Sequence, residues 1–351
     1  MLDRTDQKPP VLAVENLKKH YVLGSSWLSG ETKTVFALDG VSLSIASHET
    51  LSIVGESGSG KTTLGKVVMG LIPATAGQVH LDGRRIDNLS AAQLRPLRRD
   101  MQLIFQDPFS SLNPRMKVRD IIGEPIVNFG LASNKSELRA LTAQLLEKVR
   151  LPAEAADRYP HEFSGGQRQR IAIARALAPG ARFIVCDEAV SALDVSVKAQ
   201  IINLLQELQN DLGLTLLFIS HDLAIVEHLT HRVGVMYLGK IVEIADRRSL
   251  FRAPQHPYTR ALLSAVPVPD PQRRTTRIAL KGDIPNPMNP PSGCRFRTRC
   301  PLAFERCQHE EPILRPRGSD GHLSACHLDE LPVATASVHD HRKTGIRYAT
   351  I

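Results

Sequence analysis

The sequence lacks any apolar run long enough to cross a membrane. Its apolar stretches, such as RFIVC (182–186) and LTLLFIS (214–220), have the length of a strand, whereas a spanning helix needs about 20 apolar residues. The first residues, MLDRTDQKPPV, contain no apolar core of the length that a secretory signal carries. We therefore expect the chain to stay in the cytosol, so that any role at a membrane is a peripheral one.

The sequence contains no internal repeat. It also has fewer acidic than basic residues. The 351 residues carry 44 Lys and Arg against 36 Asp and Glu, which gives a net charge of +8. That balance favours an anionic partner, which could be a nucleotide, a nucleic acid or the anionic face of a membrane, although a merely basic soluble protein has the same charge. The length suits one large domain with a smaller one beside it.

Strands and helices alternate along the first 250 residues, and this alternation predicts an α/β fold with a parallel sheet. The strands are expected at residues 11–17, 41–46, 51–54, 101–105, 182–186 and 214–220. The helices are expected at residues 62–69, 136–150, 166–178 and 197–213. Ser136 is the predicted N-cap of the helix at 136–150.

Prolines crowd the chain after residue 253, and such a segment packs onto a core rather than building one. We therefore place a domain boundary there. The expected organisation is a flexible N-terminus (1–10), a main domain (11–253), a proline-rich C-terminal extension (254–330) and a tail without clear periodicity (331–351).

A glycine-rich loop lies between a predicted strand and a predicted helix. Its sequence, GESGSGKT (55–62), fits the pattern G-x-x-x-x-G-K-[ST] of a phosphate-binding loop, whose backbone N–H groups approach phosphate oxygens. Lys61 would reach the β- and γ-phosphates of ATP, and the hydroxyl of Thr62 would bind Mg²⁺. A glycine and serine turn that contains lysine by chance is the alternative, which the flanking strand and helix disfavour. The nucleotide contacts expected here are Gly55, Ser57, Gly58, Ser59, Gly60, Lys61, Thr62 and Thr63.

Two further predicted strands end in polar side chains. Asp187 and Glu188 follow the strand at 182–186, and His221 follows the strand at 214–220. In open α/β sheets, ligands bind at the carboxyl ends of the strands. Asp187 would hold Mg²⁺ through water, and Glu188 would polarise the attacking water as a general base. Taken alone, the acidic pair is better explained by a polar turn, but three strand ends with complementary groups favour an ATP-hydrolysing site.

A second glycine-rich turn, FSGGQRQR (163–170), also has the features of an anion site. Ser164 and Gln167 form a capping box at the start of a predicted helix. The capping box does not explain Gly165 and Gly166, because glycine in a helix costs roughly 1 kcal/mol relative to alanine. The usual reason for such glycines is the close approach of another group to the backbone, and a helix N-terminus with free N–H groups attracts anions. One ATP could occupy both turns only if the fold brought them together.

The order of these motifs resembles that of the ATP-binding cassette family. An SGGQ turn, a basic helix, a strand ending in Asp-Glu, the string SALD (191–194) and a histidine follow one another. The resemblance covers roughly residues 11–250. It implies a P-loop NTPase (RecA-like) core that carries an antiparallel β subdomain and an α-helical subdomain at about 107–165.

The resemblance also assigns roles to single residues. Tyr21 would stack on adenine, Gln106 would contact the γ-phosphate and the metal, and His221 would be the switch histidine. In this family two cassettes meet head to tail, so that ATP joins them and hydrolysis releases them. The residues that would face the nucleotide on the partner's phosphate loop are Ser164, Gly165, Gly166, Gln167 and Asp194.

Three local strings narrow the resemblance to the ATPases of oligopeptide and dipeptide importers. They are QLIFQDPFSSLNPRM (102–116), HPYTRALLSAVPVPD (256–270) and PPSGCRFRTRCP (290–301), and the first is closer to the F-type subunit than to its D-type sister. The resemblance implies a heterodimer with a D-type cassette, two membrane permeases, an external solute-binding protein and a place on the cytoplasmic face of the inner membrane. The region 107–160 would receive the permeases' cytoplasmic helices. Nickel and glutathione importers use similar ATPases, so the solute stays open.

Four of the five cysteines lie in the extension, at Cys294, Cys300, Cys307 and Cys326. Their spacing, C-x5-C-x6-C-x18-C, lacks the close pairs of common zinc sites. Four thiolates suit a [4Fe–4S] cluster, and the similar tails of peptide-importer ATPases carry that ligand set. The alternatives are four buried thiols, oxidation-prone surface cysteines, or a loose zinc site that also uses the neighbouring histidines, His322 and His327.

The main rival is a cassette ATPase that acts on nucleic acid or the ribosome rather than on a transporter. Members of the repair and chromosome-structural class carry a long coiled coil or a zinc insertion between the phosphate loop and the SGGQ turn. Here only about a hundred residues intervene, without sustained heptads. Translation factors of this kind carry two cassettes, and this chain has one. No basic groove interleaved with aromatics is visible either, so no nucleic-acid partner is expected. A nucleotide kinase is contradicted by the SGGQ turn.

Overall fold

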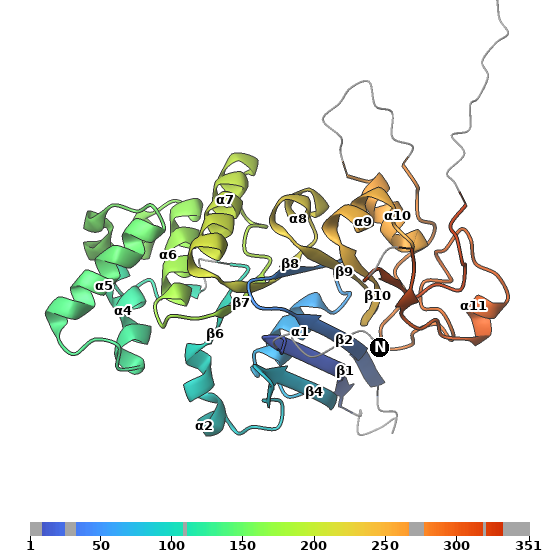
Figure 1. Ribbon diagram of the computed structural model, residues 1–351, viewed down its shortest axis with the longest axis horizontal. Helices are drawn as coiled ribbons and strands as arrows, with labels where there is room; N and C mark the ends of the chain where they lie inside the picture. Colours follow the sequence, from blue (N-terminus) through green and yellow to red (C-terminus); the bar gives the residue numbers. More distant parts are fainter. Residues whose placement is uncertain (1–8, 25–32, 108–110, 267–276, 319–320, 333–351) are drawn as a thin grey trace, which may run out of the picture.

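A computed structural model describes residues 9–24, 33–107, 111–266, 277–318 and 321–332. The expected flexible N-terminus (1–10) and the expected tail (331–351) lie almost entirely outside the described residues. Two sheets and several groups of helices make up the described part (Figure 1).

The larger sheet occupies the centre of the molecule (Figure 1), and its order in the described residues is β11-β12-β10-β9-β3-β8-β7-β6. Its strands are β3 (Thr50–Val54), β6 (Met101–Ile104), β7 (Phe183–Asp187), β8 (Thr215–Ser220), β9 (Arg232–Tyr237), β10 (Lys240–Asp246), β11 (Arg315–Pro316) and β12 (Leu323–Ser324). Strands β9, β3, β8, β7 and β6 pair in parallel, which confirms the predicted α/β fold. Every residue of β3, β7 and β8 is buried, as expected of parallel strands with both faces covered.

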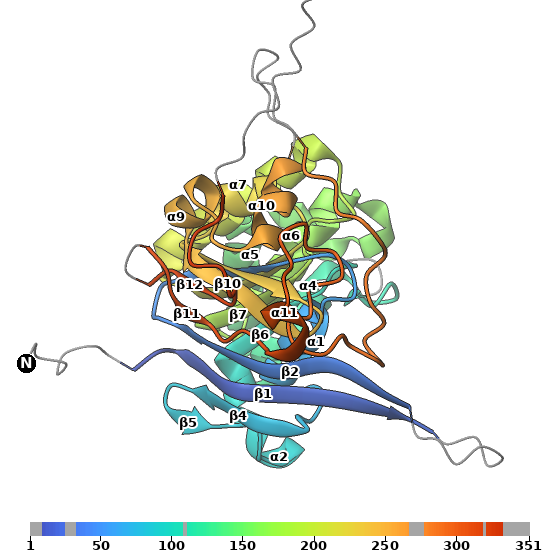
Figure 2. The ribbon, with the colours of Figure 1, turned by 90° about the vertical axis from the view of Figure 1, so that its right-hand side faces the viewer.

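The smaller sheet is antiparallel and lies beneath the core sheet as a separate layer (Figure 2). Its order is β2-β1-β4-β5, with β1 (Leu12–Leu23), β2 (Lys33–Ile45), β4 (Ala76–Leu81) and β5 (Arg84–Arg85). The sequence predicted only the halves of β1 and β2 that alternate clearly. The outer half of β1 is largely exposed and passes through register irregularities, so its pattern carries little periodic signal.

The helices fall into two groups, one around the core sheet and one at its far end (Figure 1). The first group comprises α1 (Lys61–Val68), α7 (Val195–Leu212), α8 (Leu223–Leu229), α9 (Arg247–Arg252) and α10 (Pro257–Ser264), whereas the short α2 (Ala91–Leu94) lies apart, near β4 of the smaller sheet (Figure 2). The second group comprises α4 (Val118–Asn128), α5 (Lys135–Lys148) and α6 (Gly165–Leu177), with short 3-10 turns at Ala153–Asp157 and Pro160–Glu162. No helix in the described ranges combines the length and the apolar character needed to cross a membrane.

The predicted N-cap of α5 was wrong. Ser136 lies inside the helix, and Asn134 caps it instead by accepting a hydrogen bond from the backbone N–H of Glu137 at 2.9 Å. Asparagine and serine are both good caps, and helix boundaries read from sequence are uncertain by a residue or two.

The sequence predicted that the extension only packs onto the core. In the structure it also contributes to the core. Strand β12 pairs with β10 and lengthens the main sheet. Phe296 and Tyr258 are buried against Tyr237 of β9, with ring centroids 5.3 Å and 4.8 Å from that of Tyr237. The extension also includes α11 (Arg306–His309), at the right of Figure 1. The proline-rich segment therefore supplies both strands and core side chains.

Candidate nucleotide-binding site

The strand order brings together the three strand ends that the sequence singled out. Strand β8 lies between β3 and β7, so the loop after β3, His221 after β8 and Glu188 after β7 meet at one edge of the sheet. This is the carboxyl edge, where ligands bind in parallel α/β sheets.

A pocket of about 270 Å³ opens at this edge, close to the lower end of the range of small-molecule sites. It is lined by Val35, Ala37, Ser57, Gly58, Gly60, Lys61, Thr62, Thr63, Gln106, Glu188 and Pro287. Most of the predicted nucleotide contacts are therefore neighbours in space. Val35, Ala37 and Pro287 were not predicted, because no local motif distinguishes an apolar residue of an antiparallel strand or one proline among many.

The backbone of the phosphate loop requires glycine at Gly60. Its φ is +106°, and a Cβ there would lie 2.3 Å from the carbonyl oxygen of Ala37. Such a φ and such an approach exclude any side chain. The loop therefore fits tightly beneath β2.

Lys61 is almost fully buried and is held by the loop itself. Its Nζ donates hydrogen bonds to the carbonyl oxygens of Gly55 at 2.8 Å and of Glu56 at 2.9 Å. Burial lowers the pKa of Lys61, and the nearby carboxylates of Glu188 and Asp187 oppose that shift. The ammonium group is therefore buried where a bound anion would stabilise its charged form.

Thr62 and Asp187 place two hard oxygen atoms side by side. The hydroxyl of Thr62 donates a hydrogen bond to Oδ1 of Asp187 at 3.0 Å. Burial raises the pKa of Asp187, because the charged carboxylate is poorly solvated there. Mg²⁺ prefers oxygen ligands and commonly takes one carboxylate together with substrate phosphates, so these residues fit that ion.

Glu188 has a left-handed backbone conformation, with φ of +48°, which is uncommon for a residue other than glycine. Its backbone N–H donates to the carbonyl of Ile219 at 2.9 Å, and the hydroxyl of Ser191 donates to its carbonyl at 3.0 Å. Its carboxylate accepts a hydrogen bond from Nε2 of Gln106 at 2.9 Å and lies 3.4 Å from Nδ1 of His221. The carboxylate of Glu188 thus contacts both of the other residues predicted to be catalytic, Gln106 and His221.

The second anion turn is folded as predicted but lies outside this pocket. Ser164 and Gln167 form the capping box of α6, with hydrogen bonds of 3.3 Å and 3.0 Å. Neither they, the two glycines between them, nor Asp194 at the start of α7 is among the residues that line the pocket in the described part of the chain.

Packing within the chain explains why residue 166 is glycine. A Cβ there would lie 2.4 Å from Cγ1 of Val197 on α7, so close helix packing explains one of the two glycines without any ligand. Gly165 has only an ordinary contact, because its Cβ would lie 3.4 Å from a methyl group of Leu193.

Tyr21 lies near the pocket but does not line it. It pairs across the antiparallel sheet with Val35, which does line the pocket. The Tyr21 ring is 37% exposed, with Nζ of Lys19 4.9 Å from its centroid.

The four cysteines of the extension line one small cavity of about 10 Å³. Burial raises the pKa of Cys294 to about 12 and that of Cys300 to about 11. Within the described ranges, no group of three or more His, Cys, Asp or Glu side chains could hold a metal ion. His322 is turned away, since its Nε2 lies 2.7 Å from Oε1 of the buried Glu243.

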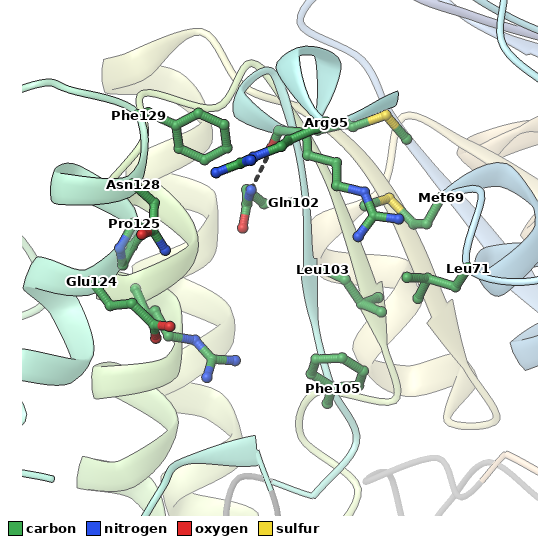
Figure 3. A pocket seen from close by; sticks show the side chains of 13 residues that line it. Met69, Leu71, Arg95, Gln102, Leu103, Phe105, Glu124, Pro125, Asn128 and Phe129 are labelled. Atoms are coloured by element: carbon green, nitrogen blue, oxygen red, sulfur yellow. Dashed lines mark hydrogen bonds between the residues drawn. The ribbon is translucent and has the colours of Figure 1, made fainter. Parts of the chain in front are cut away.

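A second large groove separates α4 from β6 (Figure 3). Its volume is about 400 Å³. The lining residues are Met69, Leu71, Arg95, Arg98, Met101, Gln102, Leu103, Phe105, Glu124, Pro125, Asn128, Phe129 and Arg175. It therefore combines exposed apolar side chains with positive charge, and Phe105 connects it to Gln106 of the nucleotide pocket.

Two family profiles match the chain. The ABC transporter profile matches residues 38–191, and that of the oligopeptide/dipeptide transporter C-terminal region matches residues 242–307. The chain is 52% identical to the probable peptide ABC transporter ATP-binding protein y4tS of Sinorhizobium fredii, over 93% of this chain and 92% of the relative. It is 47% identical to the oligopeptide transport ATP-binding protein OppF of Escherichia coli, over 92% of this chain and 97% of the relative.

Solved structures of cassettes have the same fold. A dimeric post-hydrolysis state of the ATP-binding cassette MJ0796, bound to ADP and Pi, matches with a TM-score of 0.60 and 29% identity, over 68% of this chain and 99% of that chain. The cbiO1 protein of Clostridium perfringens, part of the ABC transporter complex cbiONQ, matches with a TM-score of 0.60 and 27% identity, over 70% of this chain and 92% of that one.

Proposed function

The chain belongs to the ABC transporter family of ATPases, and from this membership we propose that it is the ATP-hydrolysing subunit of a membrane importer for oligopeptides or dipeptides. The observation that carries the proposal is the pocket at the carboxyl edge of the core sheet, where Lys61, Thr62, Gln106 and Glu188 line one space. The matching profile over the extension and the peptide importers among the relatives support the solute class.

In this proposal the pocket binds MgATP. Lys61 turns from the loop carbonyls to the β- and γ-phosphates, and Thr62 and Asp187 hold Mg²⁺, which offsets the phosphate charge. Glu188 orients the attacking water and takes its proton, with Gln106 and His221 fixing its carboxylate. Tyr21 stacks on adenine, close to Val35.

A second cassette completes the site. The capping-box turn at Ser164 begins a helix but lies outside the pocket of its own chain, and a helix N-terminus suits an anion, so we infer that this anion belongs to another subunit. Asp194 faces the same junction. ATP then joins two chains, and its hydrolysis lets them separate. We propose that the second chain is a D-type sister cassette.

The groove between α4 and β6 is the proposed docking surface for the permeases (Figure 3). Its exposed apolar side chains, such as Leu71 and Phe105, suit an amphipathic helix laid into a groove. Gln106 follows Phe105 directly, so a movement at the groove would reach the catalytic carboxylate. The chain would thus lie peripherally on the cytoplasmic face of the inner membrane, below two permeases that an external solute-binding protein supplies.

The cysteine cavity is proposed to hold a [4Fe–4S] cluster. Cys294, Cys300, Cys307 and Cys326 would supply the four thiolates that hold such a cluster. Four thiols that line one cavity match the number of thiolate ligands that such a cluster takes. When bound, the cluster would cross-link the extension.

The absorbance of anaerobically purified protein near ~400 nm, together with its iron content, tests the cluster. Wild-type protein should absorb and contain iron, and Cys300→Ser should lose both. Cys186→Ser is the matched control, because Cys186 lies in β7 and does not line the cavity. Zinc without iron, or neither metal, would exclude the cluster.

Affinity purification from native membranes tests the transport function. Two permeases and a sister ATPase should co-purify, and peptides should stimulate ATP hydrolysis when the solute-binding protein is present. Stimulation by nickel or glutathione would change the solute, whereas recovery of ribosomes or stimulation by nucleic acid would refute transport. We also propose that residues 11–253 form the cassette domain and that residues 254–330 form the C-terminal extension.

A further inference from the structure

The C-terminal extension contacts the phosphate loop at Glu56. Arg299 forms a bidentate ion pair with this residue, in which Nη1 donates to Oε2 at 2.6 Å and Nη2 donates to Oε1 at 3.1 Å. The side chain of Arg299 is 8% exposed and that of Glu56 is 26% exposed. A guanidinium that meets a carboxylate through two parallel bonds fixes both its position and its orientation.

Tyr258 holds the backbone of the same residue. Its hydroxyl oxygen accepts a hydrogen bond from the backbone N–H of Glu56 at 3.0 Å. The Tyr258 ring is fully buried, with its centroid 4.8 Å from that of Tyr237 and 5.3 Å from that of Phe296. One N–H of the phosphate loop is therefore taken up by the extension, which orients that peptide unit.

Both contacts act on the residue that precedes Ser57, which lines the nucleotide pocket. The carbonyl of Glu56 accepts a hydrogen bond from Nζ of Lys61 at 2.9 Å, so a shift of Glu56 also moves the lysine. The carboxylate of Glu56 is a negative charge in a loop that binds a polyanion, and Arg299 neutralises it. Without that partner the carboxylate would repel the phosphates in a poorly solvated place.

Arg299 is itself fixed by the folded extension. Its backbone N–H donates to the carbonyl of Phe296 at 3.0 Å. Phe296 and Cys300, which follows Arg299 in the chain, both line the cysteine cavity. The backbone of Arg299 is therefore anchored beside the cysteine cavity.

We propose that Arg299 and Tyr258 are positioning residues for nucleotide binding, which hold Glu56 so that the phosphate loop has the shape and charge that ATP requires. The inference rests on the proposed binding of MgATP at this loop. It assigns to the extension a part in the affinity for ATP, in addition to any part in assembly.

Equilibrium binding of MgATP to the purified full chain tests the inference. Arg299→Gln leaves an unpaired carboxylate in the loop and should weaken binding about tenfold. Adding Glu56→Gln to Arg299→Gln removes that charge and should restore the affinity to within about threefold of wild type. Tyr258→Phe should weaken binding less. The matched control is Glu311→Gln, because Glu311 pairs with Lys240 at 2.5 Å across the same boundary but does not contact the loop. It should bind like wild type.

Recovery in the double variant would assign the effect of Arg299 to neutralising the charge of Glu56. Equal melting temperatures of wild type, Arg299→Gln and the double variant exclude a simple loss of stability as the cause of weaker binding. Binding by Arg299→Gln equal to wild type, or a double variant as weak as Arg299→Gln, overturns the inference. Lys61→Ala separates the two proposals. If it binds MgATP like wild type, the proposed nucleotide site is wrong and the inference falls with it. If it loses binding while Arg299→Gln does not, only the inference is wrong.

Discussion

Replacing Glu188 with glutamine removes a proton acceptor while preserving the shape of the site. The amide has the same length and can keep a contact with Gln106, whose Nε2 lies 2.9 Å from the carboxylate, or with His221 at 3.4 Å. The left-handed backbone at residue 188 is held by main-chain bonds, which the change does not touch. Binding of ATP should therefore stay within about threefold of wild type.

Hydrolysis should respond very differently. A positioned general base contributes about 10²- to 10⁴-fold, which corresponds to about 3 to 5 kcal/mol of activation free energy. Glu188→Gln should lower kcat by that factor and leave ATP trapped between two closed cassettes. The same change at Glu207, which is half exposed and paired with Arg150 on the surface, should leave kcat unchanged.

The assay must isolate one of two composite pockets. Phosphate release is measured with a partner cassette whose own phosphate-loop lysine is replaced by alanine, so that only the pocket of this chain turns over. Light scattering with ATP present reports the closed pair. A kcat equal to that of wild type in this assay would refute the role of Glu188 as base, and loss of ATP binding would show that the residue acts before the chemical step.

Three further changes test other parts of the site. Ser164→Arg should leave MgATP binding to this chain's phosphate loop within about threefold in a titration, yet abolish turnover at the partner's pocket; weaker binding to this chain's own loop would contradict the shared site. Gly60→Ala should abolish ATP binding, because its Cβ would lie 2.3 Å from the Ala37 carbonyl oxygen, and retained binding would show that the loop can rearrange. His256 is fully buried and burial lowers its pKa from 6.5 to about 4, so the unfolded chain takes up a proton below pH 6.5 that the folded chain refuses until about pH 4. Stability should fall by up to about 3 kcal/mol as the pH drops through this window, and His256→Asn should remove that part of the loss in urea titrations.

Short-range patterns made much of the site predictable. The phosphate loop depends on glycines within eight residues of one another, and the acidic pair follows directly after a buried strand. Parallel strands then align their carboxyl ends whatever their separation in sequence. Three distant segments could therefore be assigned to one place without any knowledge of their contacts.

Strands β9 and β10 were not predicted, and the reason lies in the turn that joins them. They are joined by Leu238 and Gly239, both with positive φ. This conformation suits the tight turn of an antiparallel hairpin, but leucine rarely adopts it, so the dipeptide gives no turn signal in the sequence. The backbone N–H of Gly239 donates to the carbonyl of Ser59 at 2.8 Å, which shows how the hairpin supports the phosphate loop.

The contacts made by the extension could not be predicted from spacing. Arg299 and Glu56 are 243 residues apart, and nothing in either segment identifies the other. Pro287 likewise reaches the nucleotide pocket only because its carbonyl accepts a hydrogen bond from the backbone N–H of Phe36 at 3.1 Å. Such pairings follow from how the completed extension folds back over the core.

The distance in sequence between Glu56 and Arg299 also has a consequence during synthesis. A ribosome that adds about 5 to 20 residues each second needs roughly 10 to 50 s to pass from the first of these residues to the second, 243 positions later. Throughout that interval the phosphate loop of the nascent cassette lacks its contact with Arg299. ATP, which is abundant around the ribosome, would then bind firmly only after nearly the whole polypeptide has been made, so incomplete chains would be poor competitors for partner subunits.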